Sequence, residues 1–235
     1  MIKLHHVSHR FGKEEIIHHI NWELHPNRKY ILTGPSGHGK TTLLKILAKL
    51  IHPTSGKVTY DGNIKLGYLF QNNALFDSLT AFENLSFPLR ELHEIPREEI
   101  HDRVMHFLKL VGLEKAAKKF PNKLSGGMKK RLGIARALII NPSFMVYDEP
   151  TAGLDPITSR EIASLISERF EASSKGMLIV SSDLHRIKEW DGEIYFLAAR
   201  DFSPVGTFQE MKRHPNPMIH QFVTGSGHGP LGIGP

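Results

Sequence analysis

The chain has 235 residues, of which 40% are hydrophobic and 23% charged, a composition ordinary for a soluble globular protein. Its formal charge of +6 is spread along the sequence among acidic residues, so we expect a solvated surface and no nucleic-acid partner. The absence of cysteine excludes disulfides and thiolate metal sites. No apolar run approaches the roughly 20 residues that span a bilayer, and the first residues lack the apolar core of a signal peptide.

Strand-like runs recur along the chain and alternate with helical patterns. The predicted strands lie at residues 2–7, 14–24, 29–33, 57–60, 66–70, 143–147, 177–181 and 193–198. Helices are expected at about 41–51 and 157–171, and a tight turn at Gly12-Lys13 joins the first two strands. Such alternation predicts a mainly parallel sheet that is covered on both faces.

Residues from about 72 to 140 have a helical pattern and are predicted to form an inserted helical subdomain. The segment Ile95–Glu99 is expected to open a helix. Five apolar side chains then fall on one face of that helix: Ile100, Val104, Phe107, Leu108 and Val111.

Residues 215–235 are rich in glycine and proline, which predicts a mobile tail after a domain at residues 1–214. An ordered tail would need apolar contacts to offset its lost entropy. The side chains available are Met218, Ile219, Phe222, Val223, Leu231 and Ile233. We expect these side chains to pack across a dimer onto a neighbouring subunit. The alternative is that they pack onto their own domain.

Two pairs of adjacent histidines, His5-His6 and His18-His19, occur in the first strands. Adjacent residues of a strand point to opposite faces, so the members of each pair make poor joint metal ligands. We expect them to be surface residues.

The most informative segment follows the strand at 29–33 and has the pattern G-x-x-x-x-G-K-T of a phosphate loop. Its glycines allow backbone N–H groups to turn toward phosphate oxygens, and the helix that follows adds its positive dipole end. Lys40 is expected to reach the β- and γ-phosphates, and the Thr41 hydroxyl to ligate Mg²⁺. The nucleotide-binding residues are Gly34, Pro35, Ser36, Gly37, His38, Gly39, Lys40, Thr41 and Thr42.

An acidic pair, Asp148-Glu149, ends the apolar run that begins at Ser143. The carboxyl end of a buried parallel strand opens at the ligand crevice, so Asp148 is expected to bind Mg²⁺ there. Glu149 could orient the water that attacks the γ-phosphate. Alone such a pair is weak evidence, but it becomes strong beside a phosphate loop.

A second possible anion site lies at Ser125, a good helix N-cap, followed by Gly126, Gly127 and Met128. A capped helix without a ligand is the alternative interpretation. One chain needs no second phosphate site for one nucleotide unless that site serves another copy.

These motifs, with Gln71 and Gly153-Leu154-Asp155, resemble in order the nucleotide-binding subunit of ABC transporters. The resemblance covers nearly all of residues 1–215. It implies an α/β fold of the P-loop NTPase (RecA-like) class, with a mainly parallel sheet, an antiparallel β subdomain and the inserted helical subdomain. It also implies a head-to-tail homodimer with two ATP molecules, each between one phosphate loop and the other subunit's residues 124–128.

The same resemblance assigns further roles. Gln71 contacts Mg²⁺ and the attacking water and senses the membrane partner, and Asp155 crosses the dimer interface. Phe11 occupies the position of an aromatic ring that stacks on adenine, although a core role is the alternative.

A narrower resemblance links residues 69–80, 83–91 and 216–222 to the ATPases of Mla-type (MCE-associated) lipid-trafficking systems. Two further features are similar to the Mla-type ATPases: Met128, where most ABC relatives have glutamine, and the segment Asp155–Thr158. This resemblance implies a subunit at the cytoplasmic face of the inner membrane that drives phospholipid movement between two membranes. The partners implied are a multipass permease, an MCE-domain protein and often a small STAS-domain protein.

Two features depart from the family. Ser182 stands where relatives have a histidine that contacts the γ-phosphate, so hydrolysis could be slow, depend on Glu149 alone, or recruit His185. The stretch near Asp61 is shorter than the usual hairpin arm, which affects partner contacts. The alternatives left open are an importer of another small solute and a soluble ABC-type regulatory ATPase.

Overall fold

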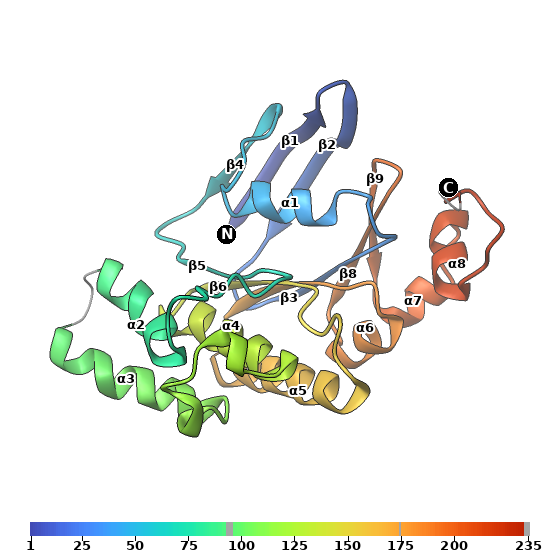
Figure 1. Ribbon diagram of the computed structural model, residues 1–235. Coiled ribbons are helices and arrows are strands. Elements are labelled where there is room, and N and C mark those ends of the chain that lie inside the picture. Colours follow the sequence, from blue (N-terminus) through green and yellow to red (C-terminus); the bar gives the residue numbers. More distant parts are fainter. Residues whose placement is uncertain (93–95, 174, 233–235) are drawn as a thin grey trace. The chain divides into compact units, whose positions relative to one another are not determined.

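The computed structural model describes residues 1–92, 96–173 and 175–232. The chain divides into two compact units, which we call the first unit (Met1–Ile64 with Ser174–Pro235) and the second unit (Lys65–Ser173). Figure 1 labels the helices and strands of both.

The first unit contains an antiparallel sheet of β1 (Ile2–Phe11), β2 (Glu14–Leu24) and β4 (Ser55–Tyr60), in the order β2-β1-β4. Phe11 pairs with Glu14 around the predicted Gly12-Lys13 turn, where Gly12 has φ 61°. The first strand continues four residues beyond the predicted end at residue 7, because it pairs with β2 as far as Phe11.

Histidines of this sheet are exposed at His6, His18 and His19, but two of them meet across the strands. His6 and His19 have φ 49° and 51°, where the β1–β2 register shifts, and Nδ1 of His6 lies 2.8 Å from Nε2 of His19. The ring centroids of His6 and His19, members of different pairs, lie 4.5 Å apart, and those of the neighbours His18 and His19 lie 6.1 Å apart. The expectation that neighbours point to opposite faces is therefore wrong for His18-His19, because the positive φ of His19 interrupts the alternation of the strand.

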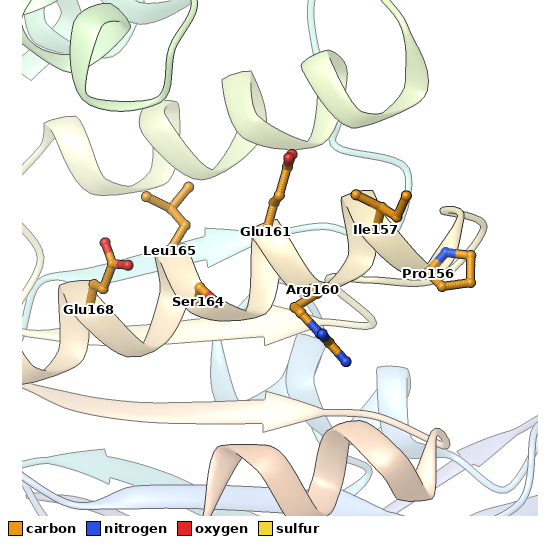
Figure 2. A pocket seen from close by; sticks show the side chains of 7 residues that line it. All are labelled: Pro156, Ile157, Arg160, Glu161, Ser164, Leu165 and Glu168. Atoms are coloured by element: carbon orange, nitrogen blue, oxygen red, sulfur yellow. The ribbon is translucent and has the colours of Figure 1, made fainter.

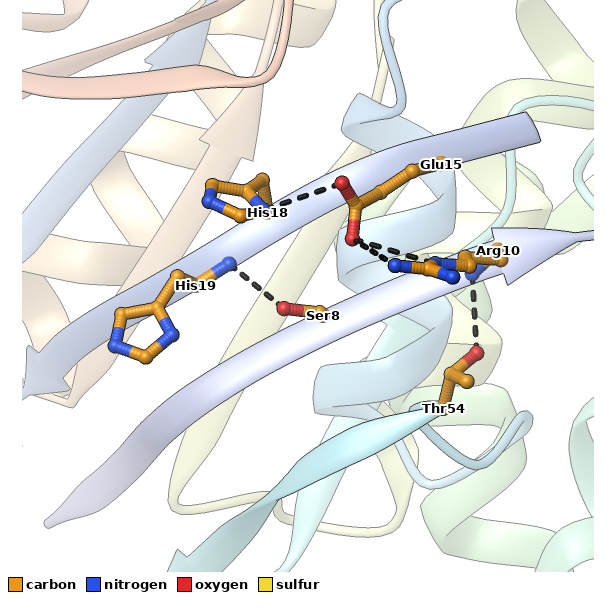
Figure 3. Close-up of polar contacts among 6 residues, drawn as sticks. All are labelled: Ser8, Arg10, Glu15, His18, His19 and Thr54. Atoms are coloured by element: carbon orange, nitrogen blue, oxygen red, sulfur yellow. Dashed lines mark hydrogen bonds and ion pairs between the residues drawn. The ribbon is translucent and has the colours of Figure 1, made fainter. Parts of the chain in front are cut away.

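Polar contacts join β1 to β2 and to Thr54, the residue that precedes β4 (Figure 3). Glu15 accepts a hydrogen bond from Arg10 and interacts with the ring of His18, at 3.4 and 3.2 Å. The backbone N–H of Arg10 donates to the Thr54 hydroxyl at 3.0 Å, which fixes the chain entering β4.

The first unit also holds β3 (Lys29–Thr33), which pairs in parallel with β7 (Gly176–Val180) and with β8 (Glu193–Ala198). The strand β9 (Asp201–Gly206) pairs antiparallel with β8 and was not predicted. It contains Pro204, which lowers strand propensity but is tolerated in an edge strand such as β9.

Helices of the first unit are α1 (Lys40–Leu47), α6 (Leu184–Trp190), α7 (Phe208–Lys212) and α8 (Pro217–Thr224). Helix α8 lies in the predicted tail and beside α7 (Figure 1). Asn216 caps its start and Gly225, with φ 64°, ends it.

The tail residues that the structure describes pack on their own chain. Ile219 is buried, and the ring of Phe222 lies 5.5 Å from that of Phe196. The Gln221 amide accepts a hydrogen bond from Leu231 N–H at 2.8 Å and donates to the Ser226 carbonyl at 3.1 Å. The tail thus follows the second alternative, packing on its own domain; Ile233 lies outside the described residues.

The second unit contains the parallel strands β5 (Leu66–Leu69) and β6 (Phe144–Asp148) and the helices α2 (Ala81–Leu92), α3 (Arg97–Leu110), α4 (Gly126–Ile139) and α5 (Pro156–Ser173). Short 3-10 turns occupy Glu114–Ala116 and Pro121–Lys123. The predicted helical segment is therefore helical, but it shares a unit with two strands and α5.

Side chains of α2, α3 and α4 and of the residues next to them form one buried hydrophobic cluster of this second unit. Ile100, Val104, Leu108 and Val111 are buried there as predicted, and Phe107 is partly buried. Burying each such side chain contributes about 1.5–3 kcal/mol. The proposed start of α3 at Ile95 lies outside the described residues.

Candidate nucleotide-binding site

The predicted phosphate loop connects β3 to α1 and has the backbone of a glycine-dependent turn. Gly34, Gly37 and Gly39 have φ 140°, 81° and 91°. A Cβ on Gly34 would collide with the carbonyl oxygen of Leu197. Gly34 is therefore required both for its backbone angle and for the close approach of β8.

The start of α1 lacks a side-chain cap, because Gly39 is its N-cap residue. The ammonium group of Lys40 donates to the carbonyls of Gly34 and Pro35, each at 2.7 Å, and the residue is only 7% exposed. Thr41 and Thr42 are half-buried in the first turn. Uncapped N–H groups beside a lysine suit phosphate oxygens.

His38 fixes the outer part of the loop. Its Nδ1 accepts a hydrogen bond from the backbone N–H of Ala199 at 3.0 Å. Burial, and then the charge of Lys40, lower the pKa of the His38 imidazole. The neighbouring Ser36 is exposed and Pro35 half-buried.

Phe11 ends β1 with 57% of its surface exposed, so it is not a core residue. The ring of His9, which is buried, contacts it edge to face with the centroids 4.8 Å apart. An exposed aromatic ring supported from below is suited to stacking on a flat base.

Ser182 follows β7 and is exposed, as is His185 in the next helix. Asp183 caps α6 by accepting from the backbone N–H groups of His185 and Arg186, at 2.9 and 3.4 Å. His185 therefore belongs to the first turn of α6 and not to the strand end.

In the second unit, Asp148 ends β6 and is 1% exposed. The Tyr68 hydroxyl donates to its Oδ2 at 3.5 Å. Burial, and then the Asp148 charge, raise the pKa of Tyr68. Next to it Glu149 is half-buried with φ 47°, an uncommon angle for a residue with a side chain. Strained angles of this kind cluster at functional sites.

Gln71 lies two residues beyond β5 with its side chain exposed. The buried Lys130 of α4 donates to the Gln71 carbonyl at 2.9 Å and to the Glu149 carbonyl at 3.4 Å. Burial lowers the pKa of Lys130, while the charges of Asp148 and Glu149 act in the opposite direction.

Lys130 was missed from the sequence, where it reads as one member of the basic run Lys129-Lys130-Arg131. The signal that could have found it is its spacing. Lys130 lies three residues after Gly127 and four before Ile134, on the buried face of α4.

At the start of α4, the Ser125 hydroxyl accepts from Met128 N–H at 3.2 Å, as expected of an N-cap. Gly126 is exposed, whereas a Cβ on Gly127 would collide with the Thr158 side chain. Close packing of α4 on α5 therefore fixes this turn.

The exposed Asp155 caps α5 by accepting from Ile157 and Thr158 N–H at 3.1 and 3.0 Å. Hydrogen bonds from the side chain and main chain of Thr158 lower the pKa of Asp155.

The predicted site residues divide between the two units. The phosphate loop, Phe11 and Ser182 belong to the first unit. Asp148, Glu149, Gln71, Asp155 and residues 125–128 belong to the second.

Two cavities are lined by residues other than these. One of about 630 Å³ runs along α5 and is lined by Pro156, Ile157, Arg160, Glu161, Ser164, Leu165 and Glu168 (Figure 2). The other, of about 360 Å³, is in the first unit and includes Trp22, Tyr30 and Tyr195. Neither includes a predicted site residue.

The family model described as ABC transporter matches residues 17–152, which include the phosphate loop and the Asp148-Glu149 pair. The chain belongs to the ATP-binding subunits of ABC transporters. It is an ABC-type ATPase that binds and hydrolyses ATP. Among the described residues, none of the helices is long and apolar enough to cross a membrane.

Curated relatives extend over almost the whole chain. The intermembrane phospholipid transport system ATP-binding protein MlaF of Escherichia coli K12 is 34% identical over 98% of this chain and 91% of its own length. MlaF of Haemophilus influenzae is 31% identical over 98% and 93%. The probable ribonucleotide transport ATP-binding protein mkl of Mycobacterium tuberculosis H37Rv is 32% identical over 99% and 68%.

Solved structures have the same fold. A dimeric post-hydrolysis state of the ATP-binding cassette MJ0796, bound to ADP and Pi, matches with TM-score 0.78 and 31% identity over 87% of this chain and 98% of that one. The structure of cbiO1 from Clostridium perfringens, part of the ABC transporter complex cbiONQ, matches with TM-score 0.79 and 25% identity over 91% of this chain and 90% of that one. The predicted P-loop NTPase class is confirmed.

Proposed function

We propose that this ATPase drives phospholipid trafficking between the inner and outer membranes. The observation that carries the proposal is the 34% identity with MlaF over 98% of this chain. The subunit would act at the cytoplasmic face of the inner membrane, through a multipass permease, an MCE-domain protein and a small STAS-domain protein. Its catalytic form would be a homodimer, the form of the MJ0796 cassette.

The phosphate loop, residues 34–42, holds the triphosphate in this proposal. Lys40 exchanges the carbonyls of Gly34 and Pro35 for the β- and γ-phosphate oxygens. Uncapped N–H groups at the start of α1 bind the same phosphates. Phe11, exposed and supported by His9, stacks on the adenine.

The oxygen donors present fit Mg²⁺, which binds hard oxygen ligands. Asp148 offers a carboxylate, Thr41 a hydroxyl and Gln71 an amide oxygen. Bound there, Mg²⁺ would neutralise charge on the phosphates. The buried Asp148 keeps one oxygen next to the Tyr68 hydroxyl, which limits how its carboxylate can turn.

Hydrolysis forms a bond from a water oxygen to the γ-phosphorus and breaks the bond to the oxygen bridging the β- and γ-phosphates. Glu149 orients that water by accepting its hydrogen bond, and as a general base it takes the proton that the water loses when the new bond forms. Gln71 holds the same water, and Ser182 donates to the γ-phosphate in place of the usual histidine. The partner's ATP is bound by Ser125, Gly126, Gly127 and Met128, with Asp155 at the dimer interface.

The test is reconstitution of the subunit with its permease and MCE-domain protein in vesicles. We expect ATP-dependent transfer of a labelled phospholipid, lost when Glu149→Gln replaces the parent in the same complex. Identification of the molecule that copurifies with the complex gives an independent readout. ATP hydrolysis with transfer of a ribonucleotide or another solute, and none of phospholipid, would overturn the lipid assignment but not the ATPase.

A further inference from the structure

Helix α4 contacts the segment after β5 through one face. Lys130, Gly133 and Arg136 are spaced by three residues, so they lie along the same side of the helix. Each of them meets the chain between Leu69 and Asn73.

The contacts of Gly133 and Arg136 hold the segment at residues 69–73 close to α4. A Cβ on Gly133 would lie 3.0 Å from Leu69 Cδ1 and 3.2 Å from Asn73 Cβ, so a larger residue would push the segment away. The Arg136 guanidinium donates to the Asn73 carbonyl at 3.1 Å. Asn73 and Ala74 themselves have φ 60° and 48°, which such contacts help to maintain.

Lys130 differs from the others because it also reaches a second chain segment. Its ammonium group donates to the carbonyls of Gln71 at 2.9 Å and Glu149 at 3.4 Å, and the residue is 3% exposed. A buried ammonium is costly unless oxygen atoms satisfy it, and here main-chain carbonyls do so. Both carbonyls belong to residues whose side chains are assigned to the reaction.

We propose that Lys130 is a positioning residue that fixes the main chain of Gln71 and Glu149 on helix α4 and thereby couples the two nucleotide sites of the dimer. The proposal rests on the proposed function of residues 125–128. Binding of the partner's ATP at the start of α4 moves or stiffens that helix. One turn further along, Lys130 carries the change to the two residues that hold the attacking water of its own site.

The test compares purified full-length variants as dimers. Lys130→Met removes the donors and keeps an unbranched chain, whereas Lys130→Arg keeps donors and should rescue. Lys129→Met is the matched control, since it removes the adjacent lysine of the same helix. The readouts are kcat, KM, the Hill coefficient for ATP, the dissociation constant of a non-hydrolysable ATP analogue and the unfolding midpoint.

We expect Lys130→Met to lower kcat about 10- to 100-fold, because small misplacements of catalytic groups have effects of that size. The analogue's dissociation constant should change less than about threefold, and the Hill coefficient should fall toward 1. Lys130→Arg and Lys129→Met should stay close to the parent. If Lys130→Met does not fold, Lys130→Gln, with an amide donor on a shorter chain, gives the same readouts.

A kcat and Hill coefficient equal to those of the parent would overturn the proposal. A Lys130→Met protein in which analogue affinity and unfolding midpoint fall together with kcat would overturn it too, because such losses indicate general structural damage. Glu149→Gln, measured alongside, separates the two levels of inference. If it abolishes hydrolysis while Lys130→Met does not, the coupling role fails and the proposed catalytic site stands.

Discussion

The imidazole of His38 is bound to the backbone of Ala199, with Nδ1 3.0 Å from that N–H nitrogen. His38 belongs to the phosphate loop, and Ala199 lies in the turn between β8 and β9. Nδ1 must be unprotonated to accept this bond. Burial and the charge of Lys40 lower the pKa of His38, and both favour the neutral ring.

The first prediction follows from that lowered pKa. The unfolded chain takes up the His38 proton near the ordinary pKa of 6.5, whereas the folded chain resists it. The folded state binds fewer protons, so this residue lowers the free energy of unfolding as the pH falls below about 6.5. His38→Gln should therefore lose less stability between about pH 7 and pH 5.5 in urea titrations. Equal losses in both proteins would show that His38 does not titrate this way.

Glu149→Gln should keep ATP binding within about twofold and lower kcat by about 100-fold or more, the usual effect of removing a general base. Glutamine has the same branching as glutamate, so the φ of 47° is no harder to adopt. Steady-state hydrolysis and nucleotide titration of the purified complex measure both quantities. Unchanged turnover would remove Glu149 from the mechanism.

Ser182→His should raise hydrolysis, by up to about tenfold, if the missing histidine limits the reaction. The position is exposed, so the larger ring needs no cavity and folding should be preserved. His185→Ala is made separately, since His185 lies in the first turn of α6. A rate equal to or below that of the parent, together with a loss in His185→Ala, would indicate a site adapted to serine.

Deletion after His214 removes α8 and uncovers Phe196. Because Ile219 and Phe222 pack on their own chain, we expect a loss of about 2–4 kcal/mol in unfolding free energy. Chemical denaturation and the monomer–dimer balance without nucleotide are measured together. A truncated protein of unchanged stability that no longer dimerises would support instead a tail that holds the dimer.

Gly34→Ala should abolish ATP binding and destabilise the fold by more than about 2 kcal/mol, because its Cβ meets the Leu197 carbonyl at an unfavourable φ. Gly37→Ala is the matched control. Its φ of 81° is also positive, but a Cβ there has no atom within 4 Å, so only about 1 kcal/mol of backbone strain is expected. Equal thermal midpoints for the two variants would show that the contact with β8 does not matter.

Local motifs of the sequence determined the class of this protein. The phosphate loop, the strand that ends in Asp148-Glu149 and the capped glycines at 125–128 are each contiguous, so each can be recognised from neighbouring residues alone. Helical periodicity likewise predicted the buried face at Ile100 and Val104, since a helix repeats its neighbours every three or four positions.

Only the tertiary structure decided features that depend on distant partners. Lys130 reaches carbonyls at positions 71 and 149, and His6 meets His19 through strand pairing, so the partners in both contacts are distant in the sequence. The strand β9 contains Pro204, and helix α8 is followed by a glycine-rich segment, so the local sequence signal for both elements is weak. Pairing with β8 and packing on Phe196 stabilise them, and contacts of this kind override local propensity.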